Sequence, residues 1–266
     1  ASTDISIDSI DAVDGAYEAG EDVPVITQLK NNSTEDSGNF NINFYVSSDN
    51  IITSADTLIG TKQVSNIAAN AGLTIDENVN LPEGLVAGDY VIGAILDIGD
   101  SNPANDTNVD QTAIYVFTQF IMNAGLNDAW FNPLTDGQGF FITVFPDLNL
   151  ISLAWFTYDT ELPPEDASAN LGDPGHRWMT AAGVIDMEKS VMNIEFTSGG
   201  IFDAASEIGR TDPPGSDGTL TIKFDNCTSG RIDYDIVSID AQGTVPIQRV
   251  AGDNIELCNA LLRESQ

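Results

Sequence analysis

Histidine, cysteine and basic side chains are scarce in this 266-residue chain. It has one histidine, His176, two cysteines and nine Lys and Arg residues, against 41 Asp and Glu residues, and its formal net charge is −32. A surface this acidic repels nucleic acid and anionic membranes, because phosphate binding requires Lys and Arg to displace counterions. The shortage of His and Cys excludes most acid–base, thiol and transition-metal chemistry. We therefore expect a protein that is not an enzyme.

The acidic residues are spread over both halves of the chain and form no tail. One interpretation is a protein kept soluble in salty water, where counterions screen self-repulsion. The other is a protein with several calcium sites. The hydrophobic content of 42% is enough to build folded cores. No apolar run reaches the roughly 18 residues of a membrane span, so none is predicted.

The two cysteines, Cys227 and Cys258, fit one disulfide, which contributes roughly 3–4 kcal/mol in the chain-entropy model. The alternative is two unpaired buried thiols. A disulfide implies an oxidising compartment, and residues 1–3 suit a mature N-terminus left after cleavage behind a small residue. We therefore expect a secreted protein. N-glycosylation sequences also occur by chance in an Asn-rich chain; here they begin at Asn31, Asn32, Asn105 and Asn226.

Helical periodicity is nearly absent, and short apolar runs alternate with Gly, Asn, Asp and Pro, which is typical of antiparallel β structure. Phe40, Ile42, Phe44 and Val46, for example, recur at every second position. Residues 1–117 hold about seven such strands, the number of an immunoglobulin-like sandwich. Residues 118–266 predict a second antiparallel β domain, a barrel or a sandwich. Its strand-like runs are 139–145, 150–158, 191–196, 220–224, 232–236 and 243–249.

Three segments of the first half carry a family resemblance: 44–60 (FYVSSD continuing to DTLIG), 81–97 (LPEGL, GDY and AILD) and the Asn-rich loop 102–108. Together, residues 4–116 resemble the CARDB family of cell-adhesion-related domains. The resemblance implies a bacterial or archaeal extracellular sandwich module, often attached to secreted enzymes and surface proteins, with an adhesive role.

The second half contains all three tryptophans. The segments AWFNP (129–133), GQGF (137–140), WFTYD (155–159), GHRW (175–178) and DNC (225–227) resemble a domain of secreted proteins from marine and soil gammaproteobacteria. That resemblance implies location and β architecture and no particular activity.

The junction segment 113–122 is apolar on both faces of an extended strand. A strand of this kind must be buried on both sides. In one interpretation its first part ends the sandwich and its second part begins the next domain. In the other, it lies in a groove of another subunit.

The sequence offers candidates for two catalytic arrangements. A Ser–His–acid triad has to use His176, but no G-x-S-x-G elbow is present, so we expect this histidine to hold a loop by hydrogen bonding. A glycosidase pair of carboxylates has its nearest candidates in Glu161, Glu165 and Asp166.

The densest group of oxygen ligands lies at the end of the first half. It comprises Asp97, Asp100, Asn102, Asn105, Asp106 and Asn108. These residues predict either a calcium site or an Asx-rich turn that caps its own backbone. We expect no cofactor other than calcium.

Tryptophans suit either core packing or an aromatic platform for sugar rings. The platform hypothesis assigns Trp130, Trp155 and Trp178.

Two functional classes follow from these observations. The first is a secreted structural or adhesive protein, a subunit of an extracellular filament or surface assembly built by strand addition or domain contacts. The expected assembly strands contain Ile5, Ile7, Ile10, Ile114, Val116, Phe117 and Phe120. The second class is a module that binds carbohydrate or protein within a secreted degradative system. In either class the partners are extracellular proteins, further copies of the chain, or carbohydrate.

Overall fold

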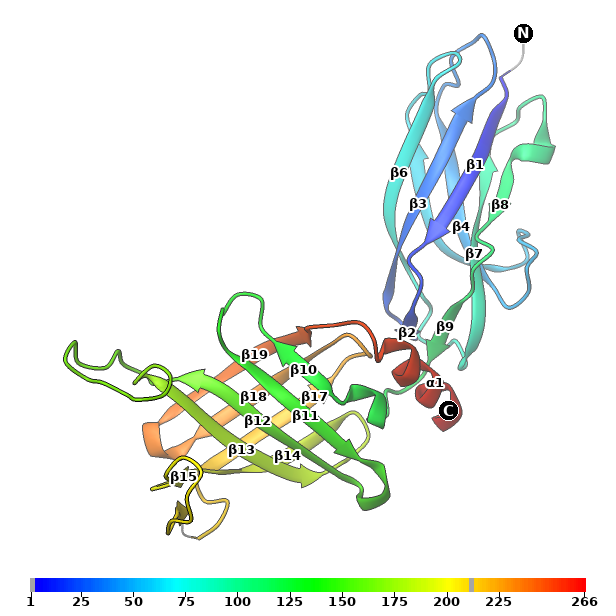
Figure 1. Ribbon diagram of the computed structural model, residues 1–266. Coiled ribbons are helices and arrows are strands. Elements are labelled where there is room, and N and C mark those ends of the chain that lie inside the picture. The colour runs from blue at the N-terminus through cyan, green and yellow to red at the C-terminus, as the bar shows by residue number, and fades with distance from the viewer. Residues whose placement is uncertain (1–2, 211–212) are drawn as a thin grey trace. The chain divides into compact units, whose positions relative to one another are not determined.

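The computed structural model describes residues 3–210 and 213–266, and the chain divides into two compact units, Ala1–Thr118 and Gln119–Gln266. Both units are built from β-strands, which confirms the predicted all-β fold class (Figure 1). Among the described residues, no helix has the length and apolar character needed to cross a membrane.

The first unit contains two sheets. One has the strand order β1-β3-β6, and the other has the order β2-β9-β7-β4-β5, with β8 also paired to β7. These strands are β1 (Ile5–Ala12), β2 (Ala16–Glu18), β3 (Asp22–Asn31), β4 (Phe40–Ser47), β5 (Thr57–Val64), β6 (Gly72–Asn80), β7 (Gly88–Asp97), β8 (Thr107–Val109) and β9 (Ile114–Phe117), with a 3₁₀ turn η1 (Pro103–Asn105).

The core of this unit lies between the two sheets. It takes Phe40, Ile42, Phe44 and Val46 from β4, as the period-2 pattern predicts, and Val23, Val25 and Leu29 from β3. One pair departs from the antiparallel prediction, because β2 runs parallel to β9. After β1 the chain leaves its first sheet and continues as an edge strand of the second, so it approaches β9 in the same direction.

The second unit is a closed eight-stranded barrel with the order β10-β11-β12-β13-β14-β17-β18-β19. Closure leaves no sheet edge unpaired. The strands are β10 (Asp128–Phe131), β11 (Gly139–Phe145), β12 (Leu150–Tyr158), β13 (His176–Val184), β14 (Lys189–Glu195), β17 (Gly218–Phe224), β18 (Ser229–Ile236) and β19 (Ala241–Arg249). The remaining elements are the hairpin of β15 (Thr197–Ser198) and β16 (Gly209–Arg210), the 3₁₀ turns η2 (Ala124–Leu126), η3 (Pro146–Leu148) and η4 (Val237–Ile239), and α1 (Ile255–Ser265).

Successive side chains of the barrel strands point alternately inward and outward. In β11, Phe140 and Ile142 are buried inside, whereas Phe141 faces outward. In β12, Trp155 is buried and its neighbour Phe156 is exposed. The outward positions therefore form a separate surface, and their side chains do not take part in the packing of the barrel core.

A disulfide attaches α1 to the barrel. Cys227, after β17, is bonded to Cys258 in α1, as the two-cysteine count predicts. Gly125 of η2 packs closely against the backbone of Cys258. A Cβ atom at position 125 would come within 2.4 Å of that backbone. The sequence did not predict α1, because this 11-residue helix buries only Cys258 and Leu262 and so shows little helical periodicity.

Arg249 is a buried cation beside the disulfide. Its guanidinium donates to the carbonyl oxygens of Cys227 and Gly125, both at 2.5 Å, and pairs with Asp128 Oδ2 at 2.8 Å. It also lies 4.6 Å from the centre of the Trp130 ring. Removal from water lowers the pKa of Arg249, while the Asp128 carboxylate opposes that shift.

Candidate functional site

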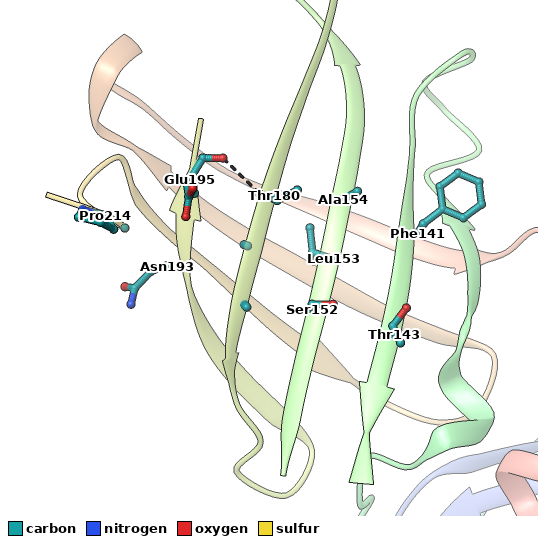
Figure 2. Close-up of a pocket in the computed structure, with 12 residues that line it drawn as sticks. Phe141, Thr143, Ser152, Leu153, Ala154, Thr180, Asn193, Glu195 and Pro214 are labelled. Atoms are coloured by element: carbon teal, nitrogen blue, oxygen red, sulfur yellow. Dashed lines mark hydrogen bonds between the residues drawn. The ribbon is translucent and has the colours of Figure 1, made fainter. Parts of the chain in front are cut away.

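A groove of about 530 Å³ lies on the outer face of the barrel, over β11, β12, β13 and β14 (Figure 2). The strand register places two rows of side chains across it: Phe141, Ala154, Thr180 and Glu195 in one, and Thr143, Ser152, Ala182 and Asn193 in the other. The loop between β14 and β17 adds Pro214 and Gly215.

The depth of the groove comes from small side chains in the middle of the sheet. Ser152, Ala154, Thr180 and Ala182 form its floor, and none of them extends far from the backbone. Figure 2 shows Phe141 on one side of this floor and Pro214 on the opposite side. A curved sheet with small residues between larger ones produces a channel open to solvent.

An outer aromatic cluster consists of Phe141, Phe156 and Trp178. Phe141 lines the groove, and the pair Phe156 and Trp178 follows two positions along the strands from the floor pair Ala154 and Thr180. The three side chains are 60%, 45% and 51% exposed. The Phe141 and Phe156 rings meet edge to face, with centroids 5.5 Å apart, and Phe156 is the cross-strand partner of Trp178. Contiguous exposed aromatic surface of this kind is characteristic of a binding site.

The polar groups of the groove are mostly uncharged. Glu195 is paired with Arg210 at 3.4 Å, and its carbonyl oxygen accepts a hydrogen bond from Thr180 Oγ1. The side chains of Thr143, Ser152 and Asn193 have no hydrogen-bond partner among the described residues, so they are available to a ligand with hydroxyl or amide groups.

The three tryptophans do not form one exposed platform. Trp130 and Trp155 are 1% and 8% exposed and belong to the barrel interior. Trp130 donates its Nε1 hydrogen to Leu126 O at 3.0 Å. Only Trp178 is on the outside, and Phe141 and Phe156 accompany it there. The alternation of β11 and β12 contained this information, but only knowledge of which face is the core reveals it.

Side chains from the predicted calcium cluster form hydrogen bonds with the backbone of β1. Asp100 Oδ2 accepts from Ile5 N at 2.7 Å, and Asn108 Nδ2 donates to Ile7 O at 2.8 Å. The side chains of Asp97 and Asn102 are exposed and make neither of these contacts. The predicted capping turn is also present, because Asp100 Oδ1 accepts from Asn102 N at 2.9 Å and Asn108 Oδ1 accepts from Val109 N at 2.8 Å. Asp100 and Asn108 therefore bond both to their own turn and to the distant strand β1.

Asp106 is the exception within this cluster. Its side chain is 7% exposed, and Asp106 Oδ1 and Asn105 Oδ1 are buried without a hydrogen-bond partner. Burial raises the pKa of Asp106 to about 6, and the charges of Asp100 and Asp4 add to this effect. In the described part of the chain, no group of three or more His, Cys, Asp or Glu side chains is placed to hold a metal ion.

The expected assembly strands are paired within their own chain. Ile5, Ile7 and Ile10 are buried in β1, which pairs with β3. Ile114, Val116 and Phe117 belong to β9, which has β7 on one side and β2 on the other. Phe120 is buried in the barrel unit, 6.4 Å from the Phe224 ring. β9 is thus paired on both edges, whereas β1 is an edge strand whose Ile5 and Ala12 N–H groups donate to the side chains of Asp100 and Asp110. Strand donation by these segments stays a prediction.

The candidate catalytic residues lie in exposed positions. His176 begins β13, and its Nδ1 accepts from Asp173 N at 3.3 Å, the loop-holding contact expected of it. Glu161, Glu165 and Asp166 are all exposed in the loop before β13.

The predicted glycosylation positions differ in accessibility. Asn31 is fully buried, and its Nδ2 donates to the carbonyls of Glu35 and Ile67. Glycosylation there is excluded in the folded unit. Asn32 is exposed, and Asn105 and Asn226 are half-buried.

Comparisons with known proteins give likenesses in structure only. No protein-family model matches the chain, and no curated protein matches it in sequence. The CARDB domain of the PF1109 protein from Pyrococcus furiosus, solved in complex with di-metal ions, has a TM-score of 0.33 and 16% identity over 43% of this chain and 89% of its own.

Two other solved structures are similar over different shares of the chain. The β-glucosidase EmGH1 from Erythrobacter marinus has a TM-score of 0.31 and 17% identity over 43% of this chain and 15% of its own. The sporulation control protein Spo0M from Bacillus subtilis has a TM-score of 0.29 and 10% identity over 79% of this chain and 89% of its own. The resemblance of the second half to a gammaproteobacterial domain stays a prediction.

Proposed function

We propose that this is a secreted, non-catalytic binding protein whose barrel unit holds a neutral carbohydrate chain in the outer groove. The observation that carries the proposal is the combination of a small-residue floor with the outer aromatic cluster beside it. Sugar rings have apolar C–H faces that pack on aromatic rings, and their hydroxyl groups pair with side chains such as Thr143, Ser152 and Asn193.

Charge supports a neutral ligand over an anionic one. The chain carries −32, and the groove itself contains Glu195, so an acidic polysaccharide is repelled over the whole surface. The disulfide supports an oxidising location outside the cytoplasm.

The experiment compares binding to immobilised neutral polysaccharides and glycan arrays. Phe141→Ala and Trp178→Ala each remove one face of the outer aromatic cluster, and we expect at least a tenfold loss of affinity. Phe145→Ala is the matched control, because Phe145 lies outward on the same strand β11 but does not line the groove. Equal binding by the native protein and all three variants, or no binding of the native protein to any neutral glycan, would refute the proposal.

A structural or adhesive role through self-association is the second candidate. Within the described residues, β5 pairs only with β4 and β6 only with β3, so each has one unpaired edge. Glu77 of β6 pairs with Lys62 of β5, and charged edges of this kind oppose strand addition. Light scattering at high salt, with and without calcium, tests this candidate: a monomer under all conditions contradicts it.

A further inference from the structure

A second, smaller cavity lies at one end of the barrel interior. It has a volume of about 180 Å³ and is lined by Asn132, Thr135, Gln138, Gly139, Phe140, Trp155, Tyr234 and Val245. Strands β11 and β12 separate it from the outer groove, because Phe140 and Trp155 face inward while Phe141 and Phe156 face outward. We call it the mouth cavity.

Three aromatic rings form one wall of the mouth cavity. The centroids of Phe140 and Trp155 are 5.0 Å apart, and those of Trp155 and Tyr234 are 5.6 Å apart. Tyr234 lies across its cross-strand partner Gly243, where a Cβ would come within 2.5 Å of the phenol oxygen. The glycine thus permits the third ring to occupy this position.

The lining also includes polar side chains with hydrogen-bond donors that the described residues do not use. Gln138 Oε1 accepts from Thr157 Oγ1 at 2.6 Å, and Asn132 Oδ1 accepts from Leu134 N at 3.0 Å. These contacts use the oxygen of each amide, and the two NH₂ groups have no partner among the residues that the structure describes. The Tyr234 hydroxyl also has no partner within the described chain. Unpaired polar groups that converge on an aromatic cavity indicate a ligand with several oxygen atoms.

We propose that the mouth cavity binds a single neutral monosaccharide residue. The cavity is smaller than the roughly 300–1,000 Å³ of drug-sized sites, which restricts it to one ring. No charged side chain lines it, so neither a carboxylate nor a phosphate finds a counterion. A quaternary ammonium ion satisfies the rings but leaves the amide donors unpaired. A pyranose satisfies both the aromatic rings and the polar groups. This site is separate from the outer groove and does not depend on it.

The test measures binding of free glucose, galactose, mannose and N-acetylglucosamine by saturation-transfer NMR and calorimetry. We expect at least one of them to bind the full chain with a Kd of about 1–10 mM. Tyr234→Phe removes one oxygen and keeps the ring, and Gln138→Leu removes the amide at similar volume. Each variant is expected to lower the affinity for that monosaccharide at least fivefold, while its near-UV circular dichroism spectrum stays the same as that of the native protein. Phe141→Ala, on the outer face, is the control and retains full monosaccharide binding.

Four results overturn the proposal. They are the absence of binding by every monosaccharide up to about 50 mM, undiminished binding by folded Tyr234→Phe and Gln138→Leu, a loss caused equally by Phe141→Ala, and binding of choline in place of all sugars. Failure of polysaccharide binding alone bears only on the outer groove, because the two sites have separate variants.

Discussion

Replacement of Asp106 by Asn tests how the first unit tolerates a buried carboxylate. The folded-state pKa of Asp106 is about 6, above the ordinary value of 3.8, because burial and the charges of Asp100 and Asp4 disfavour its ionised form. The folded unit therefore binds this proton more tightly than the unfolded chain does. Its contribution to stability is fully present below pH 3.8 and is lost as the pH rises through about 6.

The size of the effect follows from the shift. One pKa unit corresponds to about 1.4 kcal/mol, so the shift sets a ceiling of roughly 3 kcal/mol. Salt screening of the neighbouring carboxylates reduces this, and we expect Asp106→Asn to raise the free energy of unfolding by about 1–2 kcal/mol at pH 7.5. At pH 4.5 the gain should be much smaller, because Asp106 is then mostly protonated in the folded unit.

The assay is urea unfolding followed by far-UV circular dichroism, at both pH values. Tryptophan fluorescence is unsuitable, because all three tryptophans belong to the barrel unit. Asp97→Asn, an exposed carboxylate in β7, is the matched control. If Asp106→Asn is no more stable than the native protein at pH 7.5, or gains equally at both pH values, the electrostatic reasoning is wrong.

Three further predictions concern the barrel. Gly125→Ala places a Cβ within 2.4 Å of the Cys258 backbone, and we expect a loss of at least 2 kcal/mol, seen as a lower Tm; an unchanged Tm contradicts the close approach. Arg249→Met leaves Asp128 and two carbonyls unpaired in a buried site, and should cost about 3–5 kcal/mol in denaturant unfolding; a neutral effect refutes the structural role. Reduction of the Cys227–Cys258 disulfide should cost roughly 3–4 kcal/mol, and an equal Tm with and without reductant is the contrary result.

Local pattern was enough to predict much of the strand content. The alternation in 40–46 and the apolar runs 139–145 and 150–158 coincide closely with β4, β11 and β12, because a half-buried strand needs an apolar side chain at every second position. Helix α1 was missed, since a terminal helix that buries one narrow stripe carries little periodic signal.

The candidate sites were harder to predict because each depends on contacts distant in sequence. The acidic loop predicts a metal site or a self-capping turn. Asp100 and Asn108 do cap their own turn, but they also bond to β1, about a hundred positions away. No local rule gives that pairing. The three tryptophans likewise cannot be told apart by residue type, yet two lie inside the barrel and Trp178 lies outside.

The sequence by itself determined the strand-rich class, the acidic surface and the disulfide, because each follows from residue type and spacing along the chain. Barrel closure, and with it the identity of the inner and outer faces, was decided only in three dimensions. Neighbouring residues such as Phe140 and Phe141 line different cavities because the pairing register of β11 with β10 and β12 puts them on opposite faces. The pairing of β10 with the remote strand β19 closes the barrel and makes one of these faces the interior. The outer groove and the mouth cavity therefore exist only in the folded barrel.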